Sequence, residues 1–334
     1  MARTFEIADA VRERVPLLIG IMGPSGGGKT YSALRLAKGI QEFVGGEIYG
    51  IDTEARRMLA YADIFRFKHL DFKPPFGSLD YLEAIRFCAA EGAKTIIVDS
   101  ITHEHIGQGG YLEGAEAAIC RIARTDNPSY DQRKKLGMLG WAEVGPKRQR
   151  MIEGIKQIGA NLIFCSRARD KSKPADRSAK SESDEKIIHL GMMPIAGDDL
   201  LYEMTVNMLL MPRADGVPTW RSDAVGERLM MKLPEQFRHI FTEGRALDEV
   251  AGRQMAEWAA GGAAQKRSTT HQPRRSFEDA LRDEARKGTW SLEQARRKVT
   301  KPDQRARMDA IATELDVIAE AVDRADEQSR EVAA

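Results

Sequence analysis

A glycine-rich segment between a strand pattern and a helix pattern constrains the fold of this chain most. Residues 23–30 read GPSGGGKT and match GxxxxGK[ST]. The apolar run 16–22 before them predicts a buried strand, and residues 29–41 predict a helix. Glycines let the backbone wrap closely around phosphates, and the helix N-terminus attracts the anion. The segment therefore predicts a triphosphate site, with Lys29 between the β- and γ-phosphates and Mg²⁺ on the Thr30 hydroxyl. The predicted nucleotide-binding residues are Gly23, Pro24, Ser25, Gly26, Gly27, Gly28, Lys29, Thr30 and Tyr31.

Short apolar runs alternate with helical patterns through the first half of the chain. The strand-like runs are 16–22, 47–51, 66–70, 95–98 and 161–165, and the helical segments are 29–41, 78–91 and 151–158. Strands interleaved with helices predict an α/β fold with a mostly parallel, doubly wound sheet. The polar segment 166–186 predicts a mobile loop.

Residues after 200 predict two additions to this core. We expect a strand at 202–211, a β-hairpin at 219–221 and 228–233, and a helix at 247–260 with Val250 turned inward. The basic, aperiodic segment 261–275 predicts a linker, and 276–334 predicts a small helical hairpin broken at Pro302. The predicted domains are therefore 1–260, a linker at 261–275, and 276–334.

Composition excludes several classes of protein. Lys and Arg number 51 against 50 Asp and Glu, so the chain has no bulk charge for generic polyanion binding. Its three cysteines, Cys88, Cys120 and Cys165, form neither a disulfide framework nor a CxxC metal pair. The first fifteen residues are charged, and no apolar run is long enough to span a membrane. These features together predict a cytoplasmic protein without membrane contact.

Two carboxylates follow predicted strands at the edge where the glycine segment lies. Asp99 ends the run 95–98 and is the predicted Mg²⁺ ligand, unless it only caps a turn. Many ATPases carry Glu directly after this Asp, but Ser100 stands here, so the catalytic base must come from elsewhere. Glu54 ends the second strand, and the carboxyl ends of parallel strands meet at one edge. We predict that Glu54 orients the attacking water, with Glu104 as the reserve candidate; the alternative is that Asp52 and Glu54 cap the next turn.

The sequence resembles the RecA/RadA class of recombination ATPases over residues 17–165. The resemblance rests on GPSGGGKT, IDTE and TIIVDSIT. The chain is still more similar to phage-encoded AAA-domain ATPases with a RecA-type core, some of them associated with single-strand annealing. The segments that carry this second resemblance are GPSGGGKTYSALRLAKGI, IDTEARRMLAYAD, ANLIFCSRARDK and MPIAGDDLLYEMTVNMLL. Arg56 is a departure, because the resemblance leads us to expect glycine there.

The resemblance implies a RecA-like P-loop fold, ATP and Mg²⁺ as ligands, and a role near single-stranded DNA. It implies that strand 161–165 inserts between the strands that carry Asp99 and the glycine segment. Ser166 would then sense hydrolysis, and Arg167 would stabilise transition-state charge within the chain or across a subunit contact. RecA-like modules often form filaments or rings, so a homo-oligomer is a further expectation.

Basic residues in two regions are candidates for DNA contact. The first region contains Arg121, Arg124, Arg133, Lys134, Lys135, Lys147, Arg148 and Arg150, and the second contains Arg167, Arg169, Lys171, Lys173, Arg177, Lys180 and Lys186. Binding through such residues depends strongly on salt. The alternative is a solvated surface. A third basic stretch in the tail is compatible with DNA, with an acidic tail of a partner, or with a solubilising linker. It contains Lys266, Arg267, Arg274, Arg275, Arg296, Arg297, Lys298 and Lys301.

We therefore expect an ATP-hydrolysing protein that acts on single-stranded DNA in recombination, annealing or replication. A single-strand-binding or replication protein is the expected protein partner. Two alternatives stay open: a P-loop kinase for a nucleotide or small molecule, and a non-catalytic ATP switch that binds a replication partner through its helical tail.

Overall fold

The computed structural model describes residues 9, 12–174, 187–220, 232–261 and 277–332. The chain divides into two compact units, Met1–Ala263 and Ala264–Ala334. Each unit is described by itself below. Most of the predicted linker lies outside the described residues.

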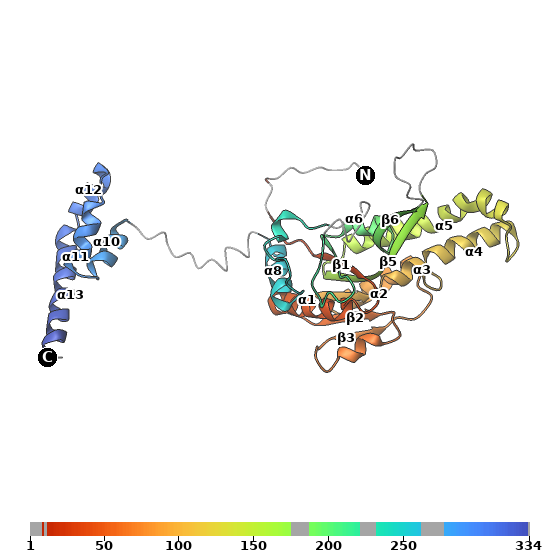
Figure 1. The fold of residues 1–334 in the computed structure, drawn as a ribbon, viewed down its shortest axis with the longest axis horizontal. Coiled ribbons are helices and arrows are strands. Elements are labelled where there is room, and N and C mark those ends of the chain that lie inside the picture. The colour runs from red at the N-terminus through yellow and green to blue at the C-terminus, as the bar shows by residue number, and fades with distance from the viewer. Residues whose placement is uncertain (1–8, 10–11, 175–186, 221–231, 262–276, 333–334) are drawn as a thin grey trace, which may run out of the picture. The chain divides into compact units, whose positions relative to one another are not determined.

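Within the described residues, seven strands form one sheet in the first unit (Figure 1). Their bounds are β1 Leu18–Gly23, β2 Ile48–Asp52, β3 Lys68–Asp71, β4 Thr95–Asp99, β5 Asn161–Pro174, β6 Ile187–Pro194 and β7 Val206–Leu209. The order is β3-β2-β4-β5-β1-β7, with all of these neighbours parallel, while β6 pairs antiparallel with β5. The predicted α/β fold with a mostly parallel sheet is confirmed, and β5 lies between β4 and β1 as the resemblance implied.

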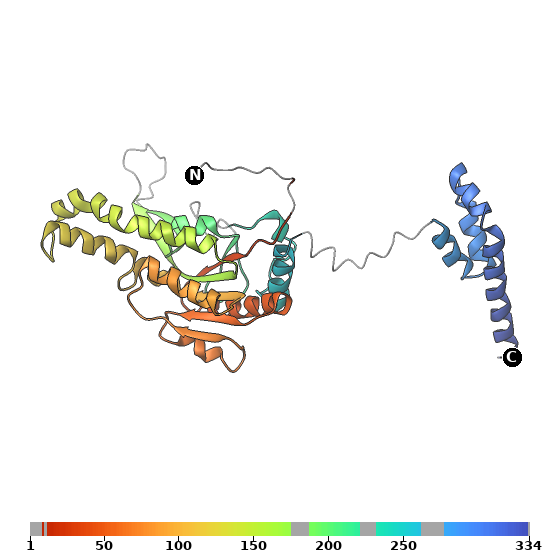
Figure 2. The same ribbon diagram turned by 180° about the vertical axis from the view of Figure 1, so that it is seen from behind.

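Helices cover both faces of the sheet (Figures 1 and 2). On one face, α1 (Lys29–Val44) and α8 (Glu249–Ala259) enclose a core with alternate residues of the central strands, such as Ile21 and Ile163. On the other face, α2 (Ser78–Ala90), α5 (Tyr130–Lys156) and α6 (Asp198–Glu203) pack on the intervening residues, such as Phe164. The sheet is thus buried on both sides, which explains why its strands read as continuous apolar runs.

The contact between α1 and α8 requires glycine. A Cβ on Gly39 would lie 1.8 Å from the Glu249 carbonyl oxygen, and a Cβ on Gly252 would lie 2.1 Å from that of Leu36. The two backbones therefore approach more closely than any side chain would allow. This contact turns α8 so that Val250 is 50% exposed, which corrects the prediction that Val250 points inward.

Two hairpins extend from the first unit. After α3 (Thr102–Ile106), helix α4 (Tyr111–Ala123) packs antiparallel to the first half of α5, as both views show (Figures 1 and 2). Strand β5 continues past the sheet and pairs with β6, so residues 166–174 are strand rather than the predicted loop. The extension carries mainly polar side chains, so the sequence shows no alternation of apolar residues that would predict a strand there.

The region after β6 differs in part from the prediction. Residues 202 and 203 end α6, and only Val206–Leu209 of the predicted strand 202–211 form β7. Thr219 pairs antiparallel with Leu209, and the Lys232 carbonyl accepts a hydrogen bond from the Asn207 N–H at 2.9 Å. The rest of the predicted hairpin lies in 221–231, outside the described residues. The described residues of this unit also contain two short 3₁₀ segments, η1 Arg57–Tyr61 and η2 Glu235–Phe237.

The second unit contains four helices within its described residues, not the predicted hairpin. They are α10 Phe277–Ala285, α11 Thr289–Arg297, α12 Pro302–Asp309 and α13 Ala312–Val332. Leu281, Leu292 and Leu315 form part of its own apolar core. No helix among the described residues of either unit is both long and apolar enough to cross a membrane.

Candidate functional site

The glycine segment forms a tight loop between β1 and α1. Gly26 and Gly28 have φ of +77° and +82°, in the left-handed region that favours glycine. A Cβ on Gly23 would lie 2.4 Å from the Leu210 carbonyl oxygen. Helix α1 begins at Lys29 without a side-chain cap, so its first N–H groups point into the loop. The loop therefore has the backbone shape and the donors that a bound phosphate requires.

Lys29 and Thr30 lie at the mouth of this loop. The Lys29 ammonium donates to the Pro24 carbonyl oxygen at 2.8 Å, and the Thr30 hydroxyl donates to Asp99 Oδ2 at 2.5 Å. Burial lowers the pKa of Lys29, although Asp99 and Glu54 act in the opposite direction. Burial also raises the pKa of Asp99 to about 6. The basic and acidic groups are thus held close together, out of bulk water.

Thr30 and Asp99 fit a magnesium ion by the chemistry of their donors. Both supply hard oxygen atoms, and the two oxygens already lie within contact of each other. Among the described residues, no cluster of three His, Cys, Asp or Glu side chains could hold a metal by itself. Magnesium commonly takes only one or two protein oxygens and completes its shell with phosphates and water.

Glu54 points toward the same loop from the end of β2. Arg167 donates to both of its carboxylate oxygens, with Nε to Oε1 at 3.0 Å, and Ser100 Oγ donates to Oε1 at 3.1 Å. Burial raises the pKa of Glu54, but the hydrogen bonds and charge of Arg167 outweigh burial, so the pKa lies below its usual value. The Arg167 guanidinium and the Ser100 hydroxyl therefore hold Glu54 in place and favour its ionised form.

The sequence left open whether Asp52 and Glu54 cap the turn after β2, and in the structure Asp52 caps it. Its carboxylate accepts from the Glu54 N–H at 2.8 Å and from the Met58 N–H at 2.9 Å, and it contacts His69 Nε2 at 3.1 Å. These bonds fix the loop after β2 and direct Glu54 toward the glycine loop. Thr53 adds a link to β4, because its N–H donates to the Asp99 carbonyl at 2.8 Å.

The loop after β2 also explains the departure at Arg56. Arg56 has φ of +67°, and Ala55 before it has φ of +55°. This is the conformation in which glycine costs least, so the resemblance correctly indicated a glycine-type position.

These groups line one cavity of about 220 Å³. Its lining residues are Ser25, Gly26, Gly28, Lys29, Thr30, Glu54, Arg57, Ala60, Tyr61, Asp99 and Arg167. The structure therefore brings together most of the residues that the sequence selected from four separate segments. Sequence reasoning missed Arg57 and Tyr61, which η1 carries into the wall.

Comparison with known families agrees with this geometry. The model of a family described as an AAA domain matches residues 16–191, which is more than half of the chain. The chain belongs to the AAA-domain family. No curated protein sequence matches it. Membership supports a P-loop ATPase that binds nucleotide, usually with Mg²⁺.

Ser166 of this AAA domain does not line the cavity. It is 2% exposed and lies on the sheet face of Phe164 and Ala168, whereas Cys165 faces α1. Its hydroxyl has no hydrogen-bond partner among the described residues. Arg167, one position on, enters the cavity instead. The sensor role of Ser166 stays a prediction that this geometry does not favour.

Two other sequence candidates lie inside the protein, away from the cavity. Glu104, the reserve base, is fully buried and accepts hydrogen bonds from Arg148 and from Ser78 Oγ. Arg148, a DNA candidate, is only 2% exposed and also donates to Asp199, with Nε to Oδ2 at 2.8 Å. Both predictions were wrong, because the two charges neutralise each other within the core.

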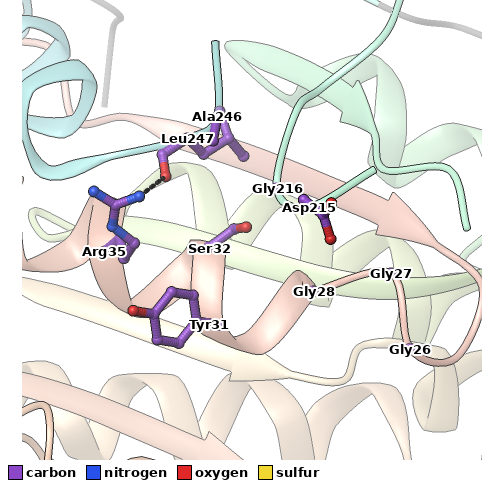
Figure 3. Close-up of a pocket in the computed structure, with 10 residues that line it drawn as sticks. All are labelled: Gly26, Gly27, Gly28, Tyr31, Ser32, Arg35, Asp215, Gly216, Ala246 and Leu247. Atoms are coloured by element: carbon purple, nitrogen blue, oxygen red, sulfur yellow. Dashed lines mark hydrogen bonds between the residues drawn. The ribbon is translucent and has the colours of Figure 1, made fainter. Parts of the chain in front are cut away.

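A second cavity, of about 300 Å³, lies on the other side of the glycine loop. It shares Gly26 and Gly28 with the first and is lined by Tyr31, Ser32 and Arg35 from α1 (Figure 3). The segment after β7 contributes Asp215 and Gly216, and the segment before α8 contributes Ala246 and Leu247. Except for Tyr31 and the glycines, sequence reasoning missed this wall. Only the strand order could have indicated this wall, because β7 ends beside β1 at the edge of the sheet where parallel strands bind ligands.

Proposed function

We propose that this protein binds ATP with Mg²⁺ across the glycine loop and hydrolyses it. One observation carries the proposal: Lys29, Thr30, Glu54, Asp99 and Arg167 line a single cavity at the mouth of the loop. In this proposal the triphosphate lies along the loop with its terminal group in the first cavity. The nucleoside takes the second cavity, against Tyr31 and the backbone at Asp215 and Gly216.

Each lining group has a distinct part in the proposed hydrolysis. Lys29 and the loop N–H groups hold the phosphates, and Thr30 and Asp99 hold Mg²⁺, which when bound neutralises charge on the phosphate oxygens. Glu54 orients a water molecule in line with the terminal phosphate and accepts its proton. Arg167 exchanges its bond to Glu54 for the terminal phosphate, where its charge stabilises the transition state.

Phosphate release with and without Mg²⁺ tests this function. We expect the wild-type chain to turn over ATP with Mg²⁺ and to stop when EDTA removes the metal. Lys29→Ala should lose both binding and turnover, while Lys38→Ala, an exposed lysine on the same helix, should retain both. Wild-type protein that neither binds nor hydrolyses ATP would overturn the proposal.

We propose further that single-stranded DNA stimulates this hydrolysis through the β5–β6 hairpin. Arg167, Arg169 and Lys171 alternate along β5 and share one side of it. Neither Arg169 nor Lys171 forms an ion pair with any described residue, so their charge is available to phosphates. DNA bound to Arg169 and Lys171 would act directly on β5, the β-strand that places Arg167 beside Glu54.

A second extension adds groups suited to single strands. On α5, Lys134 and Lys135 lie near Tyr130, which is 79% exposed, and Trp141, which is 41% exposed. Cations that follow a phosphate backbone and rings that stack on bases are the usual means of binding single strands. This combination supports DNA over a kinase acceptor as the second ligand.

A salt series with oligo(dT) tests the DNA role. We expect turnover to rise with oligo(dT) at low salt, and Arg169→Ala/Lys171→Ala to reduce the slope of log affinity on log salt by about 1.4. The control is Arg66→Ala/Arg253→Ala, two exposed arginines before β3 and on α8. If DNA changes neither binding nor turnover at low salt, the DNA role fails and the ATPase proposal survives.

A further inference from the structure

Helix α3 carries a histidine that the proposed hydrolysis does not yet use. His103 is half-buried, and its Nδ1 lies 2.7 Å from the hydroxyl of Thr53, the residue that precedes Glu54. Its ring stacks on the ring of Phe76, with the ring centres 5.1 Å apart and the planes inclined by 23°. The Gly107 N–H donates to its carbonyl oxygen at 2.7 Å. Both the ring and the backbone of His103 are therefore held in place.

The direction of the bond between Thr53 and His103 follows from a count of hydrogens. The Thr53 hydroxyl accepts from the Ser100 N–H at 2.8 Å and has a single hydrogen to donate. That hydrogen can go to His103 Nδ1, at 2.7 Å, or to the Ser100 carbonyl oxygen, at 3.1 Å. The carbonyl oxygen already accepts from the Tyr81 hydroxyl at 2.8 Å. The Thr53 hydrogen is therefore assigned to His103 Nδ1, and the ring carries its own hydrogen on Nε2.

The protonation state of His103 agrees with this direction. Burial lowers the pKa of His103, and the carboxylate of Glu54, which acts in the opposite direction, does not offset burial. The charge of Arg167 lowers this pKa further. A neutral imidazole accepts a hydrogen bond at one nitrogen, whereas a protonated ring donates from both. At neutral pH the ring is thus able to accept from Thr53.

The Thr53 hydroxyl is linked to Glu54 in two ways. Thr53 precedes Glu54 in the chain, and its own N–H is fixed by the Asp99 carbonyl oxygen at 2.8 Å. Ser100, which is 1% exposed, donates from its N–H to the Thr53 hydroxyl and from its Oγ to Glu54 Oε1 at 3.1 Å. The hydroxyl thus holds both the residue before the carboxylate and a residue that bonds to it.

The neighbours of His103 on α3 hold other parts of the site. The Thr102 hydroxyl accepts from the Arg167 N–H at 2.8 Å, and Glu104 accepts from Arg148 on α5. Helix α3 therefore contacts both β2 and β5, the strands that bring Glu54 and Arg167 to the cavity. His103 is not among the residues that line that cavity. Its place suits a group that orients other residues and does not touch the nucleotide.

We propose that His103 is a positioning residue for Glu54, the proposed base. Its Nδ1 accepts the hydrogen of the Thr53 hydroxyl, and this bond keeps Thr53 and Ser100 where they orient the carboxylate. The inference rests on the proposed hydrolysis of ATP. Loss of the bond should lower kcat and spare ATP binding, because Lys29 and the glycine loop are untouched.

Steady-state hydrolysis of ATP by full-length variants tests the proposal. His103→Asn keeps an amide oxygen at the place of Nδ1, whereas His103→Gln carries its amide one bond farther, at the place of Nε2. We expect His103→Gln and His103→Leu to lower kcat at least about tenfold while KM and ATP affinity stay within about twofold of the wild type. His103→Asn should recover most of the rate.

Variants of Thr53 test the same bond from its other end. Thr53→Ser keeps the hydroxyl and should hydrolyse ATP at close to the wild-type rate. Thr53→Val removes the hydroxyl and should lower kcat at least as much as His103→Leu. Because the bond is then already lost, adding His103→Leu to Thr53→Val should cost less than about twofold further in kcat.

His105 supplies a matched control on the same helix. It is also half-buried, its ring stacks on that of Tyr111, and its Nδ1 has no hydrogen-bond partner among the described residues. His105→Leu should therefore keep the kcat and KM of the wild type. Thermal unfolding followed by circular dichroism would verify that each variant keeps its fold at the assay temperature.

Nitrogen NMR of the imidazole rings gives a readout that needs no nucleotide. The signal that is absent from His103→Asn identifies His103, and we expect a neutral ring with its hydrogen on Nε2. Thr53→Val should move the Nδ1 signal of this ring, because the hydrogen bond to it is removed, and Thr53→Ser should leave it nearly in place.

Four results would overturn the proposal. They are an unchanged kcat in His103→Leu, equal losses in His103→Asn and His103→Gln, a loss in the double variant equal to the product of the two single losses, and an Nδ1 signal that Thr53→Val does not move. A wild-type chain that binds ATP without hydrolysing it would remove the proposed function and this role together. Normal wild-type turnover beside an unchanged His103→Leu would reject this inference alone.

Discussion

At the scale of single residues, Arg167 favours the ionised form of Glu54. The guanidinium holds both carboxylate oxygens and keeps the pKa of Glu54 low despite burial. A base with a low pKa is a weak proton acceptor, so this pairing suits a resting state. Phosphate negative charge would draw Arg167 away and leave a stronger base behind.

Replacing Arg167 tests this exchange through the pH profile of hydrolysis. In Arg167→Ala, the largest opposition to burial is removed, so the pKa of Glu54 rises and less of it is ionised at acidic pH. We expect the acid limb of the profile of kcat/KM, which reports the free enzyme, to move to higher pH, and the plateau of kcat to fall by about 10³-fold. Hydrolysis across a pH series, at ATP concentrations below and above saturation, measures both effects.

Arg57 supplies the control for this experiment. Its guanidinium lies 3.9 Å from Glu54 and is 76% exposed, so water screens it. Arg57→Ala should leave the acid limb nearly unchanged. An acid limb that stays in place or moves to lower pH in Arg167→Ala would contradict the exchange.

At the scale of elements, Arg148 links segments that lie far apart in the sequence. From α5 it donates to Glu104 on α3, to Asp199 on α6 and to the Ala196 carbonyl oxygen, and it lies 4.8 Å over the ring of Tyr111. Burial raises the pKa of Glu104, although the charge of Arg148 acts in the opposite direction. The pair therefore holds three helices in register.

Breaking this pair should destabilise the first unit strongly. Arg148→Met leaves Glu104 buried and unpaired, which costs about 3–5 kcal/mol. The double variant Glu104→Gln/Arg148→Met should recover much of the loss, because no unpaired buried charge remains. Calorimetric unfolding of both variants checks this. Equal destabilisation in the single and double variants would show that the ion pair does not matter.

The sequence predicted elements wherever a local pattern determines them. The glycine loop and strand β4 are examples, since left-handed glycines and a continuous apolar run each leave a short-range signature. Burial of Arg148 could not be predicted, because its partners lie at positions 104 and 199 and no local pattern connects them. The side of β5 on which Ser166 lies was predictable from alternation with Ile163 and Cys165.

At the scale of the whole molecule, the described residues of each unit form an apolar core of their own. One encloses the sheet with α1, α2, α5 and α8, and the other lies within α10 to α13. The linker pattern indicated two parts, but the number of helices in the second was underestimated. Helices α10, α11 and α12 are only 8 or 9 residues long, and the sequence shows only one clear break, at Pro302.

Two cores predict two unfolding transitions, of which ATP stabilises one. With Mg²⁺ and a non-hydrolysable ATP analogue at about 100 times its Kd, the first unit should gain about 2.7 kcal/mol. Leu281→Ala, in the second core, should lower only the other transition, by about 2–5 kcal/mol. Scanning calorimetry separates the two. A single transition that shifts with both changes would contradict independent cores.

The central claim is that Glu54 activates water at the mouth of the glycine loop. Single-turnover hydrolysis of ATP by Glu54→Gln, beside a binding measurement on the same protein, tests it most directly. We predict ATP affinity close to that of the wild type and a rate at least about 10²-fold lower, since glutamine keeps the shape of the side chain but accepts no proton. A variant that hydrolyses ATP at the wild-type rate would contradict the account.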